Sequence, residues 1–126
     1  MTLLWVMLGG AIGSAHRYGI GKWLPTPTGG FPWSTFWVNA SGCLLIGILA
    51  GYFEKRSVNS ESLRWFWMAG ICGGFTTFSA FSLETVSLLQ QQCWLLAVGY
   101  VLASVGIGLL ATLASWQYLR TESLLQ

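Results

Sequence analysis

Hydrophobic residues fall into four long runs along the chain, and short polar intervals separate these runs. A helix that crosses a bilayer needs about 20 mostly apolar residues. Four segments have that length, near residues 2–21, 33–53, 64–89 and 94–117. The pattern therefore predicts an all-α membrane protein with four transmembrane helices, in a single domain over 1–126.

The polar intervals differ in character. The cluster "PTPTGGFP" between the first two segments cannot continue a helix. The interval 54–64, "EKRSVNSESLR", carries five of the ten charges. "QQQ" at 90–92 is so short that we expect a tight turn, with the third and fourth helices antiparallel. The first segment has no basic leader and runs into Arg17, so we expect it to be retained as a membrane helix.

Composition supports a membrane protein. The chain is 54% hydrophobic and 8% charged, whereas a soluble domain is about 25% charged. Trp and Tyr gather where a bilayer meets water. The pairs Trp5/Trp23, Trp33/Tyr52 and Trp94/Trp116 bracket three of the segments, 18 to 22 residues apart. At 1.5 Å per residue this is about 27–33 Å, close to the thickness of a hydrocarbon core.

Glycines recur at the spacing that lets membrane helices approach closely. GxxxG pairs occur at Gly9/Gly13, Gly47/Gly51 and Gly70/Gly74, while Ser104 and Gly108 extend the small-residue pattern to the fourth segment. Close backbone packing is what holds helices together in lipid. We therefore expect a tightly packed bundle, within one chain or between chains.

The positive charges are only weakly asymmetric. Four spans place both termini and the 54–64 loop on one side, with Lys55, Arg56, Arg64 and Arg120. Lys22 belongs to the opposite side, with Arg17 near the end of the first segment. Since loop Lys/Arg bias sets orientation, two readings remain open, a chain that inserts both ways round and a single orientation set by a modest bias.

Polar residues inside the spans are candidates for function, because burying them in lipid is costly. Asn39 lies one turn from both Thr35 and Gly42, so these residues share a face. Hydroxyls could instead bond to their own helix or join helices, but an Asn with two polar stripes favours a polar pathway. The second stripe is Tyr100, Ser104, Gly108 and Thr112 in the fourth segment, and in the third segment Ser79, Ser82 and Thr85 flank Phe78 and Phe81.

The spans hold little that could perform catalysis. Arg17 and Glu84 are the charges well inside them, with His16 beside the arginine. The sequence shows neither a carboxylate relay nor a Cys/His metal cluster, and we interpret Cys43, Cys72 and Cys93 as small apolar core residues. We therefore expect no enzyme. A path lined by hydroxyls, an amide and the positive edges of aromatic rings suits a small anion.

Three stretches resemble one family. "GGFTTFSAFSLE" at 73–84 is similar to the Fluc (CrcB) fluoride-channel signature GGxTTFSTFSxE. "WVNASGCLLIG" at 37–47 and "GGAIGSAHRY" at 9–18 resemble the family's second and first helices. Ala80 departs from the signature, because the family often has Thr there. That departure removes one hydroxyl and keeps the ring pair.

The resemblance implies a passive, fluoride-selective channel that exports fluoride across the prokaryotic plasma (inner) membrane and so gives fluoride resistance. It implies an antiparallel, dual-topology homodimer with two pores, and a third helix broken at mid-membrane. There, the backbone carbonyls of Gly73 and Thr76 from both subunits would hold one structural Na⁺.

The resemblance also assigns roles to side chains. Phe78 and Phe81 would line the pore, with Asn39 as a hydrogen-bond donor to fluoride. Arg17 matches a vestibule arginine, and Glu84 matches an acidic position whose role the sequence does not supply. Thr35, Tyr100 and Ser104 match a polar track.

Two other classes of membrane protein remain as alternatives to a fluoride channel. One is a small multidrug-type, proton-coupled exporter, which also has four spans and dual topology but relies on a carboxylate in its first helix. The first segment here has none. The other is a non-transporting membrane scaffold subunit, which would explain the glycine pairs but not the polar residues of the third segment.

Overall fold

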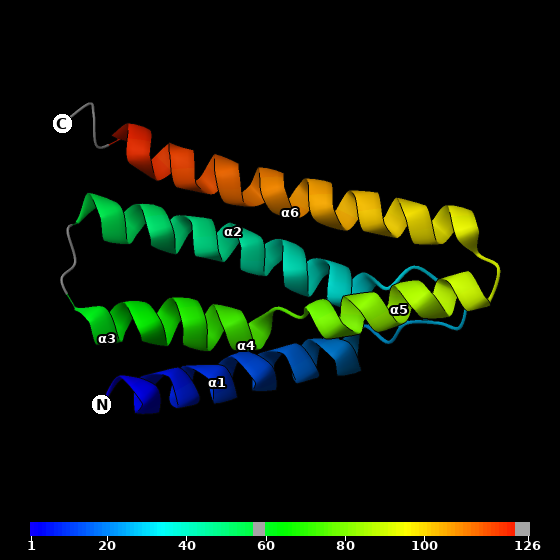
Figure 1. Cartoon of the computed structure of the whole chain (residues 1–126), viewed down its shortest axis with the longest axis horizontal. Coiled ribbons are helices and arrows are strands. Elements are labelled where there is room, and N and C mark those ends of the chain that lie inside the picture. The colour runs from blue at the N-terminus through cyan, green and yellow to red at the C-terminus, as the bar shows by residue number, and fades with distance from the viewer. Residues whose placement is uncertain (57–59, 123–126) are drawn as a thin grey trace.

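The computed structural model describes residues 1–56 and 60–122, and over these residues the chain is helical apart from short connections. Four helical rods lie side by side, and the third is built from consecutive pieces (Figure 1). The predicted segments agree with these rods, while residues 57–59 of the predicted 54–64 loop lie outside the described residues. The helices are α1 (Thr2–Trp23), α2 (Trp33–Lys55), α3 (Glu61–Arg64), η1 (Trp65–Cys72), α4 (Gly73–Phe75), α5 (Phe78–Gln90) and α6 (Trp94–Glu122).

Three of the four rods have the length and apolar character of a transmembrane helix. Within the part of the chain that the structure describes, they are Trp33–Lys55, Glu61–Gln90 and Trp94–Thr121. The rod formed by α1 is also long but is less apolar, because glycines and the polar residues Ser14, His16 and Arg17 lower its average hydropathy. The prediction of four spans is thus supported for the last three segments.

Glycines bring α1 against η1 and α4. A Cβ on Gly9 would collide with the carbonyl oxygen of Phe66, and one on Gly13 would collide with that of Ile71. On the other side of the contact, a Cβ on Gly74 would lie 2.9 Å from the Cα of Gly10. The GxxxG pairs of the first and third segments therefore face each other within one chain.

The contact between α2 and α6 is built in the same way. A Cβ on Gly47 would collide with the Ser115 hydroxyl, and one on Gly51 would lie 2.9 Å from Leu119 Cβ. Thr112 Oγ1 donates a hydrogen bond to the carbonyl of Cys43 at 3.0 Å. The polar stripe of the fourth segment thus faces α2.

The turn predicted at 90–92 is confirmed. The helix α5 ends at Gln90, and Gln92 has the left-handed φ of 59° that reverses the chain. The amides of Gln91, Gln92 and Cys93 donate to the carbonyls of Ser87, Leu89 and Leu88. This turn places α5 beside the start of α6 (Figure 1).

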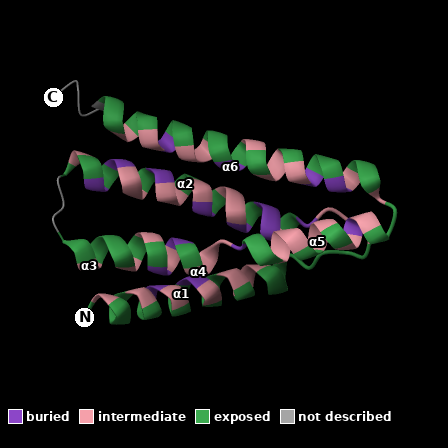
Figure 2. Ribbon diagram, viewed as in Figure 1, coloured by how far each residue is buried: buried purple, intermediate pink, exposed green. Residues whose placement is uncertain are grey.

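Exposed positions occur along all four rods (Figure 2), and many large apolar side chains are among them. Leu95 is 88% exposed and Leu83 is 72% exposed. A small buried cluster of Phe36, Leu88, Ala97 and Tyr100 joins α2, α5 and α6. Such an apolar exterior fits a chain surrounded by lipid or by another copy.

Candidate functional site

The chain leaves helical geometry between α4 and α5. Thr76 has ψ of 159°, and Thr77 has φ of −149° and ψ of 120°, so both are extended. Thr77 then caps α5, because its hydroxyl accepts a hydrogen bond from the Ala80 amide at 3.2 Å. Two adjacent glycines, which are poor helix formers, precede this link. The polar signature segment is thus the point where the third rod changes from one helix to the next.

Asn39 holds this link from α2. Its Nδ2 donates to the Thr77 carbonyl at 3.0 Å, and its Oδ1 accepts from the Thr77 amide at 2.8 Å. The side chain therefore pairs with both backbone polar groups of Thr77, and its Oδ1 takes the place of the Gly73 carbonyl as the acceptor for the Thr77 amide. Gly42, one turn later on the same face, lets the Thr76 side chain pack against α2.

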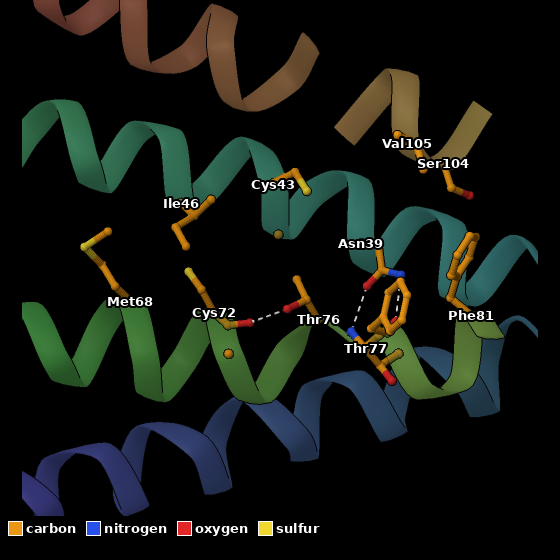
Figure 3. A pocket seen from close by; sticks show the side chains of 13 residues that line it. Asn39, Cys43, Ile46, Met68, Cys72, Thr76, Thr77, Phe81, Ser104 and Val105 are labelled. Atoms are coloured by element: carbon orange, nitrogen blue, oxygen red, sulfur yellow. Dashed lines mark hydrogen bonds between the residues drawn. The ribbon is translucent and has the colours of Figure 1, made fainter. Parts of the chain in front are cut away.

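A cavity of about 340 Å³ lies beside this link, between α2, the third rod and α6. Figure 3 shows Asn39, Thr76 and Thr77 at its centre, with Phe81 and Ser104 toward one end. We call it the central cavity. Its lining residues are Asn39, Gly42, Cys43, Ile46, Met68, Cys72, Gly73, Thr76, Thr77, Phe78, Phe81, Ser104 and Val105.

Two phenylalanine rings border the central cavity. The centroids of Phe78 and Phe81 lie 5.7 Å apart with an angle of 41° between the rings. Phe78 is 80% exposed in the single chain, whereas Phe81 packs against Tyr100 at 5.1 Å. The Phe81 ring is thus held by contacts within the chain, whereas the Phe78 ring projects from its surface.

Ser104 supplies the cavity with an unused hydroxyl. Among the described residues, its Oγ is the one buried side-chain polar atom that has no hydrogen-bond partner. Such atoms are rare, and this hydroxyl is able to donate to a molecule or ion that enters the central cavity. By contrast, the hydroxyls of Ser82 and Thr85 on α5 donate to carbonyls of their own helix.

Glu84 is the centre of a second polar group. Its Oε1 accepts from Thr35 Oγ1 at 2.7 Å, and its Oε2 accepts from Tyr100 Oη at 2.8 Å. The hydroxyls predicted to face an anion thus donate to a carboxylate here. No role for Glu84 could be predicted from the sequence, although its isolated charge inside a span made it a candidate.

Donors from α1 reach the carbonyls of the link. Ser14 Oγ donates to the Gly74 carbonyl at 3.3 Å, and one guanidinium nitrogen of Arg17 donates to the Thr76 carbonyl at 3.2 Å. The amide of Thr77, the usual helix donor to the Gly73 carbonyl, is bound to Asn39 instead. Arg17 therefore acts on the link itself, which the sequence did not indicate.

Residues 4–116 match the family described as CrcB-like protein, Camphor Resistance (CrcB). The chain belongs to the CrcB family. It is 46% identical over 115 residues to a protein of Flavobacterium psychrophilum named fluoride-specific ion channel FluC, covering 88% of this chain and 90% of that one. Proteins with the same name from Rhizobium meliloti and Nitrobacter winogradskyi are 41% and 43% identical, over 94% of this chain in each case and 95% and 94% of theirs.

Membership of the CrcB family confirms two expectations from the sequence. The chain is an integral membrane protein, and it is not an enzyme, because the relatives named above are ion channels. The structure also places most of the predicted CrcB site residues together. Asn39, Gly73, Thr76, Phe78, Phe81 and Ser104 line the central cavity, Thr35 and Tyr100 meet at Glu84, and Arg17 bonds to Thr76.

Proposed function

We propose that this chain is the subunit of a passive, fluoride-selective ion channel that exports fluoride across the plasma membrane. One observation carries the proposal most directly. The central cavity is lined by two phenyl rings, one amide and three hydroxyls, and no Lys, Arg, Asp or Glu is among the described residues that line it. Relatives that align with nearly the whole chain are named fluoride-specific ion channels.

The cavity chemistry suits a small anion that must pass rather than stay. The edges of phenyl rings carry partial positive charge, and the Ser104 hydroxyl is free to donate. Asn39 uses one amide hydrogen on Thr77 and retains the second. Such neutral donors replace part of the water around an anion without the deep electrostatic trap of a fixed cation.

The polar group at Glu84 continues this path. Phe81 borders the central cavity and packs against Tyr100, which in turn donates to Glu84. An ion leaving Phe81 would next meet the hydroxyls of Tyr100 and Thr35, and it would have to draw their hydrogens away from the Glu84 carboxylate, to which both now donate. We assign Thr35, Tyr100 and Ser104 to a polar track on this basis.

The remaining parts of the architecture follow from the same proposal. Helix α1 would form the fourth span, because it packs against η1 and α4 along their length. The extended link at Thr76 and Thr77 lies midway along its rod (Figure 1), which would put a helix break near mid-membrane. Exposed backbone at that depth must be covered by protein or water.

A second, antiparallel copy would supply that cover. Phe78 is 80% exposed beside the cavity, so the proposed pore wall is incomplete in one chain. The end of the bundle that holds the two termini (Figure 1) carries four positive residues, Lys55, Arg56, Arg64 and Arg120. Lys22 lies at the other end, in the last turn of α1. An antiparallel homodimer distributes these charges equally and gives two pores.

The link also fits a structural Na⁺. Carbonyl oxygens are suitable ligands for hard cations, and the described residues hold no cluster of three His, Cys, Asp or Glu side chains that could do so. The Gly73 carbonyl has lost its usual helix donor. The Thr76 carbonyl accepts one hydrogen bond from Arg17 and has a second lone pair. When bound, Na⁺ would balance the partial negative charges of carbonyl oxygens from two chains.

Anion efflux from liposomes that contain the purified protein tests the function. We expect rapid fluoride efflux with no proton gradient and little chloride efflux. Equal chloride flux, or fluoride transport that stops when a proton ionophore collapses the pH gradient, would exclude a selective passive channel. The second outcome would favour a proton-coupled exporter.

A further inference from the structure

A second cavity, of about 320 Å³, lies where the loop between α1 and α2 crosses α5. We call it the loop cavity. It contains Glu84 at one side and several neutral polar side chains around it. Its lining residues are Thr26, Pro27, Thr28, Gly29, Gly30, Pro32, Leu83, Glu84, Ser87, Leu88 and Gln91.

The loop is folded onto α5 by specific contacts. Gly29 has a φ of 69°, which favours glycine, and the Gly30 amide donates to the Pro27 carbonyl at 2.9 Å. A Cβ on Gly29 would lie 3.3 Å from Gln91 Oε1, so the loop touches the end of α5. Gln91 Nε2 in turn donates to Ser87 Oγ at 2.9 Å. The Pro/Gly cluster therefore forms a wall with a defined shape.

The loop cavity is connected to the central cavity through side chains in contact. Phe81 lines the central cavity and packs against Tyr100 at 5.1 Å. Tyr100 Oη donates to Glu84 Oε2 at 2.8 Å, and Glu84 lines the loop cavity. The central cavity therefore borders one end of the Phe81–Tyr100–Glu84 contact chain, and the loop cavity borders the other end.

We propose that the loop cavity is the mouth through which the transported anion regains its water, with Thr26, Thr28, Ser87 and Gln91 as its donors. This inference rests on the proposed function. A water needs about 10–15 Å³ of accessible space, so a volume of about 320 Å³ holds several. Neither Lys nor Arg is among the described lining residues, so no fixed cation retains the ion, and the Glu84 carboxylate further weakens anion binding there.

Charge placed in the loop cavity tests this proposal. The native cysteines are first replaced as Cys43→Ala, Cys72→Ala and Cys93→Ala, and Ser87→Cys is then added. Because Cys43 and Cys72 line the central cavity, every efflux rate is compared with that of this cysteine-free parent. The protein is treated in detergent with a sulfonate-bearing methanethiosulfonate, labelling is measured by mass spectrometry, and fluoride efflux is measured after reconstitution. Gln90→Cys, an exposed neighbour outside both cavities, is the matched control.

We expect labelled Ser87→Cys to lose about tenfold in efflux rate, because the label adds a second negative charge, beside Glu84, to an anion path. Labelling with a neutral methyl reagent should reduce efflux much less, and labelled Gln90→Cys should conduct like the unlabelled protein. Thr28→Cys, on the loop itself, gives the same test if Ser87→Cys does not fold.

Complete labelling with unchanged efflux would overturn the loop cavity as a mouth and leave the proposed function intact. Absence of labelling would overturn it as well, because a mouth must be open to water. If the cysteine-free parent and the wild-type chain both fail to pass fluoride, the proposed function itself fails.

Discussion

Asn39 gives the clearest case of a single side chain that determines local geometry. Its side chain bonds to the Thr77 carbonyl at 3.0 Å and to the Thr77 amide at 2.8 Å. The chain can therefore leave the helix without unpaired backbone groups at Thr77. The same residue lines the central cavity. Changes at Asn39 should therefore affect conduction and the shape of the link together.

We predict that Asn39→Asp lowers fluoride efflux by about 100-fold, because it adds negative charge to an anion path and removes the donor to the Thr77 carbonyl. Ser41→Ala is the control, since the Ser41 hydroxyl bonds to carbonyls of its own helix. Efflux from liposomes measures both variants. Wild-type rates in Asn39→Asp would place the pathway elsewhere.

The ring pair can be tested with side chains that keep the apolar character. Phe81→Ile should reduce fluoride efflux by about three- to tenfold, because aliphatic carbons lack the positive edge that an aromatic ring presents. Phe78→Ile should behave similarly, with the folded state checked by size-exclusion chromatography. If both variants conduct normally and elute normally, the rings serve packing alone.

Much of the candidate site was predictable from residue types and spacing. Thr35, Asn39 and Gly42 were expected on one face, and all three now contact the third rod. The contacts to Glu84 were not predictable, because Tyr100 lies 16 positions away and on another helix. The bond from Arg17 to Thr76, separated by 59 positions, depends equally on tertiary packing.

At the scale of elements, glycine contacts decide how the rods pack. Gly9→Ala should destabilise the fold by about 1–3 kcal/mol, because its methyl group would overlap the Phe66 carbonyl and the backbone must move. Gly10→Ala is the matched control, since nothing lies within 4 Å of a Cβ there. Thermal unfolding in detergent compares the two, and equal midpoints would contradict the packing described for α1.

Hydrophobic runs and turn residues were sufficient to predict the rods and their order. The bounds of α2, Trp33–Lys55, and the turn after Gln90 follow from the Pro/Gly cluster and the glutamines. The π-helix η1 over Trp65–Cys72, which packs against α1, was not expected, because π-helical hydrogen bonding is rare and has no simple sequence pattern. The modest hydropathy of α1 likewise reflects the glycines that this contact needs.

At the scale of the whole molecule, the proposed dimer makes a prediction about orientation. A single cysteine at Lys55, in a chain without its native cysteines, should be labelled from outside sealed vesicles in about half of the molecules. The weak charge bias of one chain and the need to cover the link both favour this result. Labelling of all sites or of none would contradict dual topology and remove the partner proposed for the Na⁺ site.

Passive conduction selective for fluoride can be tested by the reversal potential of the purified protein in a planar bilayer. With fluoride at a tenfold gradient and chloride equal on both sides, we expect the current to reverse at the fluoride equilibrium potential, about 59 mV in magnitude. A reversal potential near zero, or one that follows an opposing chloride gradient or a pH gradient, would contradict it.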